Sequence, residues 1–313
     1  MNLDALKAHI KLLDVSCKPA TSDAERDYFR HYGINFEEQS DNVVHHFGHF
    51  QANHFDIVAH YFEHAQARAT CFIVHGYYDH AGLYGKLIDY CLQRKYSVVI
   101  FDLPGHGLST GERAAINSFA DYQQALQSVL FKFDGVAPSP WYAIGQSTGS
   151  AILMDFILSG GGDAFAKTVL LAPLYRPAGW TAGRRLHTVV SPFLKRIRRK
   201  FANNSHDQQF LELLNYRDPL QSRYLSLRWV SALKNWMRHF DNLPVSDYAP
   251  LVIQGKEDTT VDWHHNLPVI EQKFPRAKIY FLREGRHHLA NESEDIRGKI
   301  YSAMDLYFDN FHS

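Results

Sequence analysis

Long apolar runs are absent from this sequence. No stretch approaches the roughly 18 unbroken apolar residues that a membrane-spanning helix needs, so we expect no transmembrane segment. The opening stretch, MNLDALKAHIKLLDV, interleaves charged with apolar side chains and carries no secretory core, so we expect no signal peptide. An excess of charge of one sign is also absent, because 33 Lys and Arg residues balance 33 Asp and Glu residues. The composition therefore gives no indication of a nucleic-acid partner.

Cysteine is scarce. Cys17, Cys71 and Cys91 are odd in number and form no closely spaced pair, which argues against a disulfide scaffold and indicates reduced thiols in a cytoplasm. Histidine is plentiful, with 19 residues, but no HExxH motif or Cys/His set makes a metal site of them. We therefore expect a cytoplasmic protein that needs neither a metal nor an organic cofactor.

Short, fully apolar runs alternate with amphipathic helical patterns through most of the 313 residues. An antiparallel strand pair is predicted over 43–62. Apolar runs follow at 71–74, 96–101, 141–144, 167–172, 251–255 and 278–282, and helical patterns at 81–95, 119–133, 263–274 and 293–309. Such alternation is typical of an α/β fold with a mostly parallel central sheet covered by helices on both faces.

One region breaks this alternation. Roughly seventy residues separate the predicted strand at 167–172 from the one at 251–255, too many for a simple crossover. We interpret this insertion as a helical lid over the carboxyl ends of the strands, where ligands bind in such sheets. The predicted division is a core of residues 1–174 and 244–313, with 1–40 as an N-terminal helical extension, and a lid or cap over 175–243.

Two G-x-S-x-G pentapeptides, at 107–111 and 145–149, contain a candidate nucleophile. A nucleophile elbow needs a strand directly before the serine and a helix directly after it, so that helix N-terminal amides face the reacting oxygen. Ser147 has both, since WYAI precedes it and apolar residues follow it at helical spacing. Ser109 follows Pro-Gly-His-Gly and precedes Glu-Arg, which indicates a loop. We therefore predict Ser147 as the nucleophile.

A serine nucleophile needs a base, and the base needs an acid that orients it. In sheets with such an elbow the acid and then the histidine follow the serine along the chain, on loops after later strands. Asp258 directly follows the strand LVIQG, and His287 follows KIYFL. Glu257 and Asp262 compete with Asp258, and His288 competes with His287, because adjacent residues cannot both point at the serine.

The developing oxyanion must also be held. His75, Gly76 and Tyr77 follow the strand CFIV, where an amide of the first crossover loop should face the nucleophile. We assign the backbone N–H groups of Tyr77 and Thr148 to the oxyanion hole. His75 and Gly76 shape this turn, and together with Gln146 they are the expected substrate-binding positions.

Several segments occur in an order and spacing that one family shares. They are His75-Gly76 with Asp79-His80, FDLPGHGLS at 101–109 with Gly111-Glu112-Arg113, the elbow at 145–149, Gln254-Gly255 with Asp258, and GRHHLANE at 285–292. Through them the chain resembles the monoacylglycerol lipase and lysophospholipase branch of the α/β hydrolases, among the serine aminopeptidase S33-type hydrolases. The resemblance spans residues 71–292 and implies an α/β-hydrolase fold with a helical lid insertion.

The family pattern favours one candidate in each of the open assignments, of the base, of the acid and of the role of Ser109. It places the histidine five residues before the glutamate that is here Glu292, which favours His287 as base. It also favours Asp258 as acid, and it implies that Ser109 belongs to a structural loop. The chain departs from the pattern at Gln146, where lipases of this branch usually carry histidine.

The resemblance implies a serine hydrolase that cleaves carboxylic esters through an acyl-enzyme on Ser147. Acyl esters such as a monoacylglycerol or a lysophospholipid are the expected small-molecule substrates. The same triad would also serve an acyltransferase or a peptidase of the proline-iminopeptidase kind. A non-catalytic protein that binds a lipid or a membrane is the alternative from another class.

A basic stretch within the predicted lid indicates where in the cell the protein could bind. Residues 164–206 contain nine Lys or Arg and no Asp or Glu, and apolar residues are interleaved over 184–200. Such a segment can rest on an anionic membrane surface, where each cation contributes about 1 kcal/mol. We therefore expect peripheral contact at the inner membrane surface through 184–200, beside the alternative of a solvated basic surface that binds nothing. No nucleic-acid module accompanies this stretch.

Overall fold

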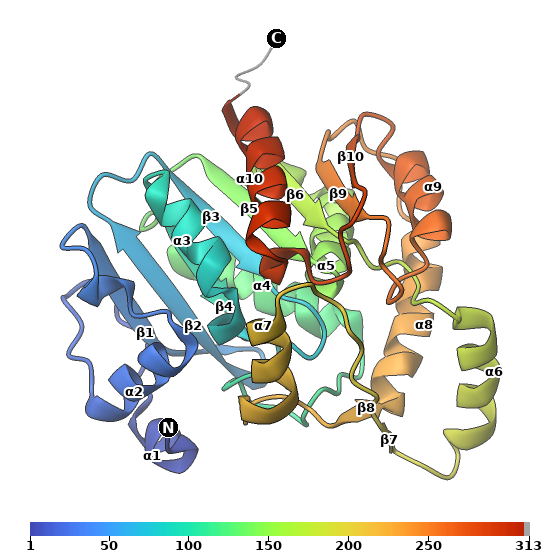
Figure 1. The fold of residues 1–313 in the computed structure, drawn as a ribbon, viewed down its shortest axis with the longest axis horizontal. Helices are drawn as coiled ribbons and strands as arrows, with labels where there is room; N and C mark the ends of the chain where they lie inside the picture. Colours follow the sequence, from blue (N-terminus) through green and yellow to red (C-terminus); the bar gives the residue numbers. More distant parts are fainter. Residues whose placement is uncertain (310–313) are drawn as a thin grey trace.

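One eight-stranded sheet forms the centre of the molecule in the computed structural model, which describes residues 1–309 (Figure 1). Its order is β1-β2-β4-β3-β5-β6-β9-β10. The strands are β1 (Val43–Ala52), β2 (Phe55–His64), β3 (Ala69–Val74), β4 (Tyr96–Phe101), β5 (Trp141–Gln146), β6 (Lys167–Leu171), β9 (Leu251–Gly255) and β10 (Lys278–Leu282). β1 and β2 pair antiparallel, as do β2 and β4, and every other pair is parallel.

The central strands are apolar on both faces because helices cover both faces. In β3, Cys71 and Ile73 point into one hydrophobic core, whereas Phe72 and Val74 point into the other. The first core is closed by α3 (Gly85–Gln93) and α10 (Glu294–Asp309), and the second by α4 (Phe119–Phe133), α5 (Thr148–Phe156) and α9 (Trp263–Lys273). The mostly parallel, helix-covered sheet predicted from the sequence is confirmed, and β4, β9, β10 and α4 have the predicted bounds.

The N-terminal residues add two helices on the side of β1 and β2 (Figure 1). They are α1 (Leu3–His9) and α2 (Asp23–Tyr32). Ser22 caps α2 in a reciprocal capping box with Glu25, which satisfies amides that a helix start leaves unpaired. Tyr28 and Phe29 of α2 are buried in the first core, where they pack against His60 of β2.

The segment between β6 and β9 contains α6 (Trp180–Val190), β7 (Arg196–Arg198), α7 (Gln208–Glu212), β8 (Tyr224–Ser226) and α8 (Leu227–Asp241). β7 and β8 pair antiparallel in a small sheet of their own. α8 buries Trp229, Leu233, Trp236 and Phe240, which recur at helical spacing on one face. Trp229 stacks on Tyr77, with 3.8 Å between ring centroids, so α8 lies beside the loop at the carboxyl end of β3.

The basic stretch 184–200 divides between α6 and β7. α6 is largely exposed, and His187 is its buried residue. No helix within residues 1–309 is long and apolar enough to cross a membrane.

Candidate active site

Ser147 stands on a strained turn between β5 and α5. Its backbone has φ 54° and ψ −108°, a conformation that costs a residue with a Cβ about 1–3 kcal/mol. Two glycines make this turn possible by close approach. A Cβ on Gly149 would lie 1.9 Å from the carbonyl oxygen of Val74, and a Cβ on Gly145 would lie 2.6 Å from the backbone nitrogen of Ser150. The pentapeptide therefore forms a tight turn from strand to helix with Ser147 at its apex.

A chain of hydrogen bonds links three predicted site residues. His287 Nε2 lies 3.0 Å from Ser147 Oγ, and His287 Nδ1 lies 2.8 Å from Asp258 Oδ2. Because the carboxylate accepts the Nδ1 proton, Nε2 is left to accept from the serine hydroxyl. The other oxygen of Asp258 accepts from the backbone N–H groups of Thr260 and Val261, at 2.8 and 3.1 Å. This geometry is that of a nucleophile, a base and an orienting acid.

The electrostatics of the pair suit this arrangement. Burial alone raises the pKa of Asp258, but the adjacent His287 and the hydrogen bonds to its carboxylate outweigh burial and lower that pKa. Burial lowers the pKa of His287, but the charge and hydrogen bond of Asp258 outweigh it and raise that pKa. Ser147 is only 8% exposed, so these interactions act in a site with little solvent screening.

The competing candidates lie elsewhere. The side chain of Glu257 is 47% exposed and pairs with His206 at 3.4 Å and with Arg286 at 3.7 Å. Asp262 pairs with Arg176 at 2.6 Å. His288 points away from the serine, and its Nε2 lies 3.1 Å from Asp79 Oδ2. The structure thus brings Asp258 and His287 into one hydrogen-bond chain with Ser147 and leaves these three apart.

The loop after β3 carries the amide expected at the oxyanion. Within residues 1–309 the backbone N–H groups of Tyr77 and Thr148 have no hydrogen-bond acceptor, so both are available to a reacting oxygen. Asp79 holds this loop, since its Oδ2 accepts from Gly76 N–H at 3.2 Å and from Tyr84 OH at 2.8 Å. Sequence reasoning missed the role of Asp79, although the residue lies within the family pattern.

Gln146 connects the elbow to the histidine loop. Its Nε2 donates to the carbonyl of His287 at 2.9 Å, and its Oε1 accepts from Ala290 N–H at 3.3 Å. The side chain was expected to contact substrate, but both of its polar ends are engaged in this bridge. Sequence alone gives no signal for such a contact, because its partners lie more than a hundred positions away.

The side chains of His75 and Ser109 likewise form hydrogen bonds with nearby backbone groups. His75 Nδ1 bonds the carbonyl of Gly76 at 2.8 Å, and Nε2 accepts from Leu103 N–H at 2.9 Å. Ser109 donates to the carbonyl of Asp102 at 2.6 Å. Its hydroxyl also accepts from Val58 N–H at 2.9 Å, so the second pentapeptide lies in a hydrogen-bonded loop.

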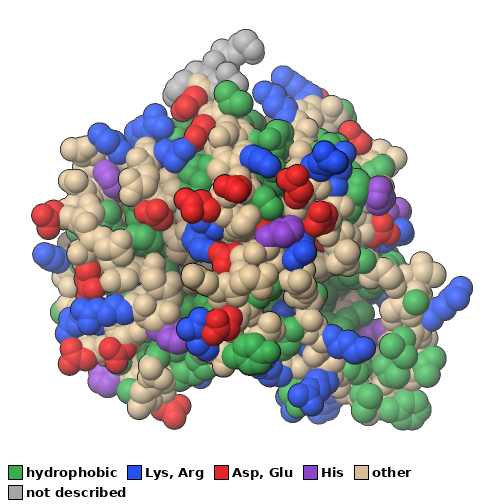
Figure 2. Space-filling view, viewed as in Figure 1, with side chains coloured by type: hydrophobic (Ala, Val, Ile, Leu, Met, Phe, Trp, Pro, Cys, Tyr) green, Lys and Arg blue, Asp and Glu red, His purple; other side chains and the backbone are tan. Residues whose placement is uncertain are grey.

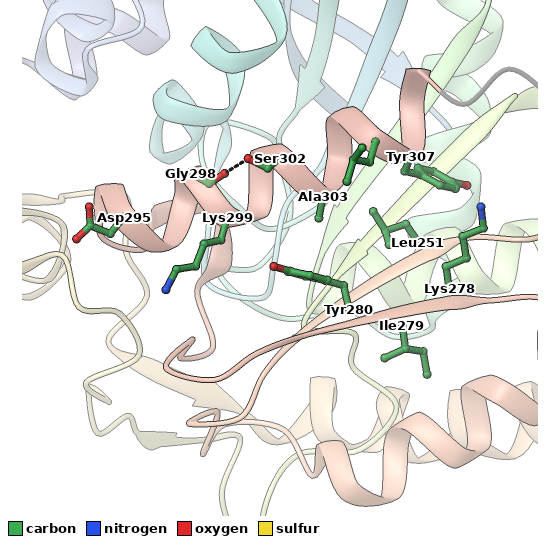
Figure 3. Close-up of a pocket in the computed structure, with 11 residues that line it drawn as sticks. Leu251, Lys278, Ile279, Tyr280, Asp295, Gly298, Lys299, Ser302, Ala303 and Tyr307 are labelled. Atoms are coloured by element: carbon green, nitrogen blue, oxygen red, sulfur yellow. Dashed lines mark hydrogen bonds between the residues drawn. The ribbon is translucent and has the colours of Figure 1, made fainter.

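A surface pocket of about 550 Å³ lies away from this site, between β10 and α10 (Figure 3). Tyr280 of β10 and Tyr307 of α10 are among the side chains that line it, and no residue of the Ser147 hydrogen-bond chain does. The pocket therefore has no part in the chemistry of Ser147.

The elbow after β5, the carboxylate after β9 and the histidine after β10, on an eight-stranded and mostly parallel sheet, define an α/β hydrolase. The family model described as serine aminopeptidase, S33, matches residues 65–294, and the chain belongs to this family.

Named relatives and solved structures agree with this assignment. Phospholipase YtpA of Bacillus subtilis is 25% identical over 78% of this chain and 96% of its own length. Human monoglyceride lipase is 25% identical over 77% of this chain and 82% of its own length. A soluble variant of the monoglyceride lipase of Saccharomyces cerevisiae, solved with a substrate analog, has TM-score 0.72 at 15% identity and covers 83% of this chain and 94% of that one. The predicted α/β-hydrolase fold is thereby confirmed.

Proposed function

We propose that the protein is a serine hydrolase that cleaves carboxylic esters through an acyl-enzyme on Ser147. The observation that carries the proposal is the continuous hydrogen-bond chain from Ser147 Oγ through His287 to Asp258. It ends at a serine held in the strained elbow conformation, beside two unpaired backbone amides.

In the proposed mechanism, Ser147 Oγ attacks the ester carbonyl carbon while His287 Nε2 takes the hydroxyl proton. The amides of Tyr77 and Thr148 hold the oxyanion, and Asp258 stabilises the imidazolium. His287 then protonates the leaving alcohol, which departs and leaves the acyl-enzyme. Water, deprotonated by the same nitrogen, releases the acid. Every step uses groups of this chain and water.

The proposed substrates are medium- or long-chain acyl esters, such as a monoacylglycerol or a lysophospholipid. Their support is the similarity to proteins named phospholipase and monoglyceride lipase. We propose that the insertion 175–243 acts as a lid, since its helix α8 stacks Trp229 on Tyr77 of the proposed oxyanion loop.

The test is hydrolysis of p-nitrophenyl esters from acetyl to palmitoyl by the wild type and by Ser147→Ala. Losing the nucleophile should cost up to about 10⁶-fold in turnover. We expect an optimum at eight carbons or longer in the wild type and background rates in the variant. An optimum at acetyl would discard the lipid substrate, and activity that survives Ser147→Ala would discard the mechanism. Transfer of the acyl group to an added alcohol in preference to water would identify an acyltransferase.

We further propose that the protein works in the cytoplasm and contacts the inner membrane surface through residues 184–200. Figure 2 shows hydrophobic side chains gathered at the lower right, where Figure 1 places α6, with Lys and Arg side chains near them. Val189 of α6 is 67% exposed, and Phe193, shortly after the helix, is 83% exposed. Apolar side chains among cations are what binding to an anionic interface requires.

Cosedimentation with phosphatidylcholine vesicles, with and without phosphatidylserine, tests this contact. We expect binding that needs phosphatidylserine and weakens with salt. Phe193→Ser should weaken binding, whereas Phe131→Ser, which changes an equally exposed residue on α4, should not. Equal effects of both substitutions, or no binding to either vesicle, would contradict the proposal.

A further inference from the structure

Arg199 places a cation against the loop that carries the proposed oxyanion amide. It follows β7 directly, and its backbone N–H donates to the carbonyl of Arg223 at 3.0 Å. Its guanidinium carbon lies 3.8 Å from the ring centroid of Tyr78. Tyr78 directly follows Tyr77, whose backbone amide is proposed to hold the oxyanion. The cation therefore contacts the neighbour of that residue.

Within residues 1–309 the guanidinium of Arg199 forms no ion pair, because no carboxylate oxygen lies within 4.0 Å of it. Its side-chain hydrogen bonds run from Nη1 alone, to Gln221 Oε1 at 2.8 Å and to the carbonyl of Ser222 at 3.5 Å. Asp79 is the nearby buried carboxylate, but it already accepts from Gly76, Tyr84 and His288. A guanidinium matches carboxylate and phosphate groups geometrically, so its unused N–H groups are suited to an oxyanion.

Gln221 contributes a second donor at the same place. The side chain is buried, with 7% of the residue exposed. Because a guanidinium only donates, the amide oxygen must face Arg199, and this fixes the orientation of the amide. The amide nitrogen on the same group is then a buried donor, and it has no acceptor within residues 1–309. Buried donors without an acceptor are uncommon, and this one lies beside an unpaired cation.

Aromatic rings fix the position of this cation. The guanidinium of Arg199 lies 4.4 Å from the ring centroid of Phe201 as well as against Tyr78. Arg223 lies on the same Phe201 ring, at 4.8 Å, and adds a second positive charge nearby. A guanidinium that contacts two rings is restricted in position, which favours presentation of its remaining N–H groups to an oxyanion.

We infer that Arg199 and Gln221 bind a phosphate group on the substrate, so that the enzyme prefers acyl esters of glycerol phosphate to neutral monoacylglycerols. The inference rests on the proposed function, because it concerns the head group of the ester that Ser147 attacks. Arg199 supplies the charge-assisted contact, and Gln221 Nε2 supplies the second donor. In this proposal the phosphate binds beside the oxyanion loop, and the glycerol of the substrate separates the phosphate from the reacting carbonyl.

The test compares 1-octanoyl-glycerol 3-phosphate with 1-octanoyl-glycerol, which share one acyl chain. Both are used below their micelle concentrations, so that attraction to a charged lipid surface does not contribute. The measured quantity is the ratio of kcat/KM for the phosphate ester to kcat/KM for the neutral ester. We expect a ratio above one in the wild type and a fall of about tenfold or more in Arg199→Gln, through KM for the phosphate ester.

Arg198→Gln is the matched control, because it removes the same charge from the exposed neighbouring residue on β7. We expect its ratio to stay near that of the wild type. Gln221→Leu removes the second donor without a change of charge and should also lower the ratio. Thermal unfolding of each variant identifies a loss of structure, which would slow both substrates alike.

The outcomes separate the two proposals. If p-nitrophenyl esters are hydrolysed with dependence on Ser147 but Arg199→Gln leaves the ratio unchanged, the phosphate site is wrong and the hydrolase stands. An equal fall in Arg198→Gln would show a general charge effect and would also overturn the site. If the wild type hydrolyses no ester, the proposed function fails, and the phosphate preference fails with it.

Discussion

Replacing Asp258 with asparagine tests how the triad works. Oδ1 of Asp258 accepts from two backbone N–H groups, of Thr260 and Val261, whereas Oδ2 accepts from His287 Nδ1 and Gln254 Nε2. Backbone donors cannot reverse, so the amide oxygen of the new asparagine must face them. Its NH₂ group then faces His287 Nδ1, which must accept instead of donate.

The magnitude follows from this reversal. With the proton moved to Nε2, the imidazole donates to Ser147 Oγ and can no longer take its proton. The wrong tautomer in a Ser-His-Asp triad lowers kcat by about 10⁴-fold, equivalent to about 5.4 kcal/mol in the barrier. The fold should survive, since the side chain keeps its size and its two backbone hydrogen bonds. Within residues 1–309 Gln254 Oε1 is buried without a partner. Rotation of that amide would present Oε1 to the new NH₂ group, at the cost of the hydrogen bond from Nε2 to the Gly255 carbonyl.

The assay is kcat on the best p-nitrophenyl ester at pH 8, with thermal unfolding recorded beside it. Glu257→Gln is the control, because this neighbouring carboxylate is half exposed and lies away from His287. Its kcat should stay within about twofold of the wild type. The reasoning is refuted if Asp258→Asn keeps more than about a tenth of the activity, or if Glu257→Gln loses as much.

Two further predictions concern pH and the inserted segment. His287 must be neutral to act as base, and its pKa is raised because the Asp258 carboxylate outweighs the effect of burial. A raised pKa keeps the imidazole protonated to higher pH, so kcat/KM should fall as the pH drops, with a midpoint above the ordinary 6.5. A pH–rate profile measures this midpoint, and a value below 6.5 would contradict the prediction. Leu233 of α8 is fully buried, so Leu233→Ala should lower the free energy of unfolding by about 2–5 kcal/mol in urea titrations. Phe131→Ala, at a residue that is 84% exposed, should change it by less than about 0.5 kcal/mol, and comparable losses would contradict the packing of α8.

The sheet could be predicted because its signal is local. A parallel strand covered on both faces is an unbroken apolar run, as in YSVVIF for β4 and LVIQG for β9, and its bounds can be read directly. The elbow is equally local, since strand, serine, glycines and helix occur within a few positions of one another. Ser147 could therefore be chosen over Ser109 without tertiary information.

The sequence says much less about the inserted segment. β7 is a three-residue strand, Arg-Ile-Arg, with no apolar run, and its partner β8 lies more than twenty positions further along. Its formation depends on a long-range pairing that no periodicity records. The contact between Arg199 and Tyr78 is of the same kind, because it joins this segment to the loop after β3.

The departure from the family at Gln146 becomes intelligible only with the contacts in view. The bridge to the histidine loop needs one donor, toward the His287 carbonyl, and one acceptor, toward Ala290 N–H. A neutral histidine, the usual residue of this lipase branch, also offers one donor and one acceptor. Protonation would turn the acceptor of such a histidine into a second donor aimed at an N–H group, whereas glutamine does not titrate. Gln146 therefore makes the bridge without adding an acid-sensitive contact to the loop that carries His287.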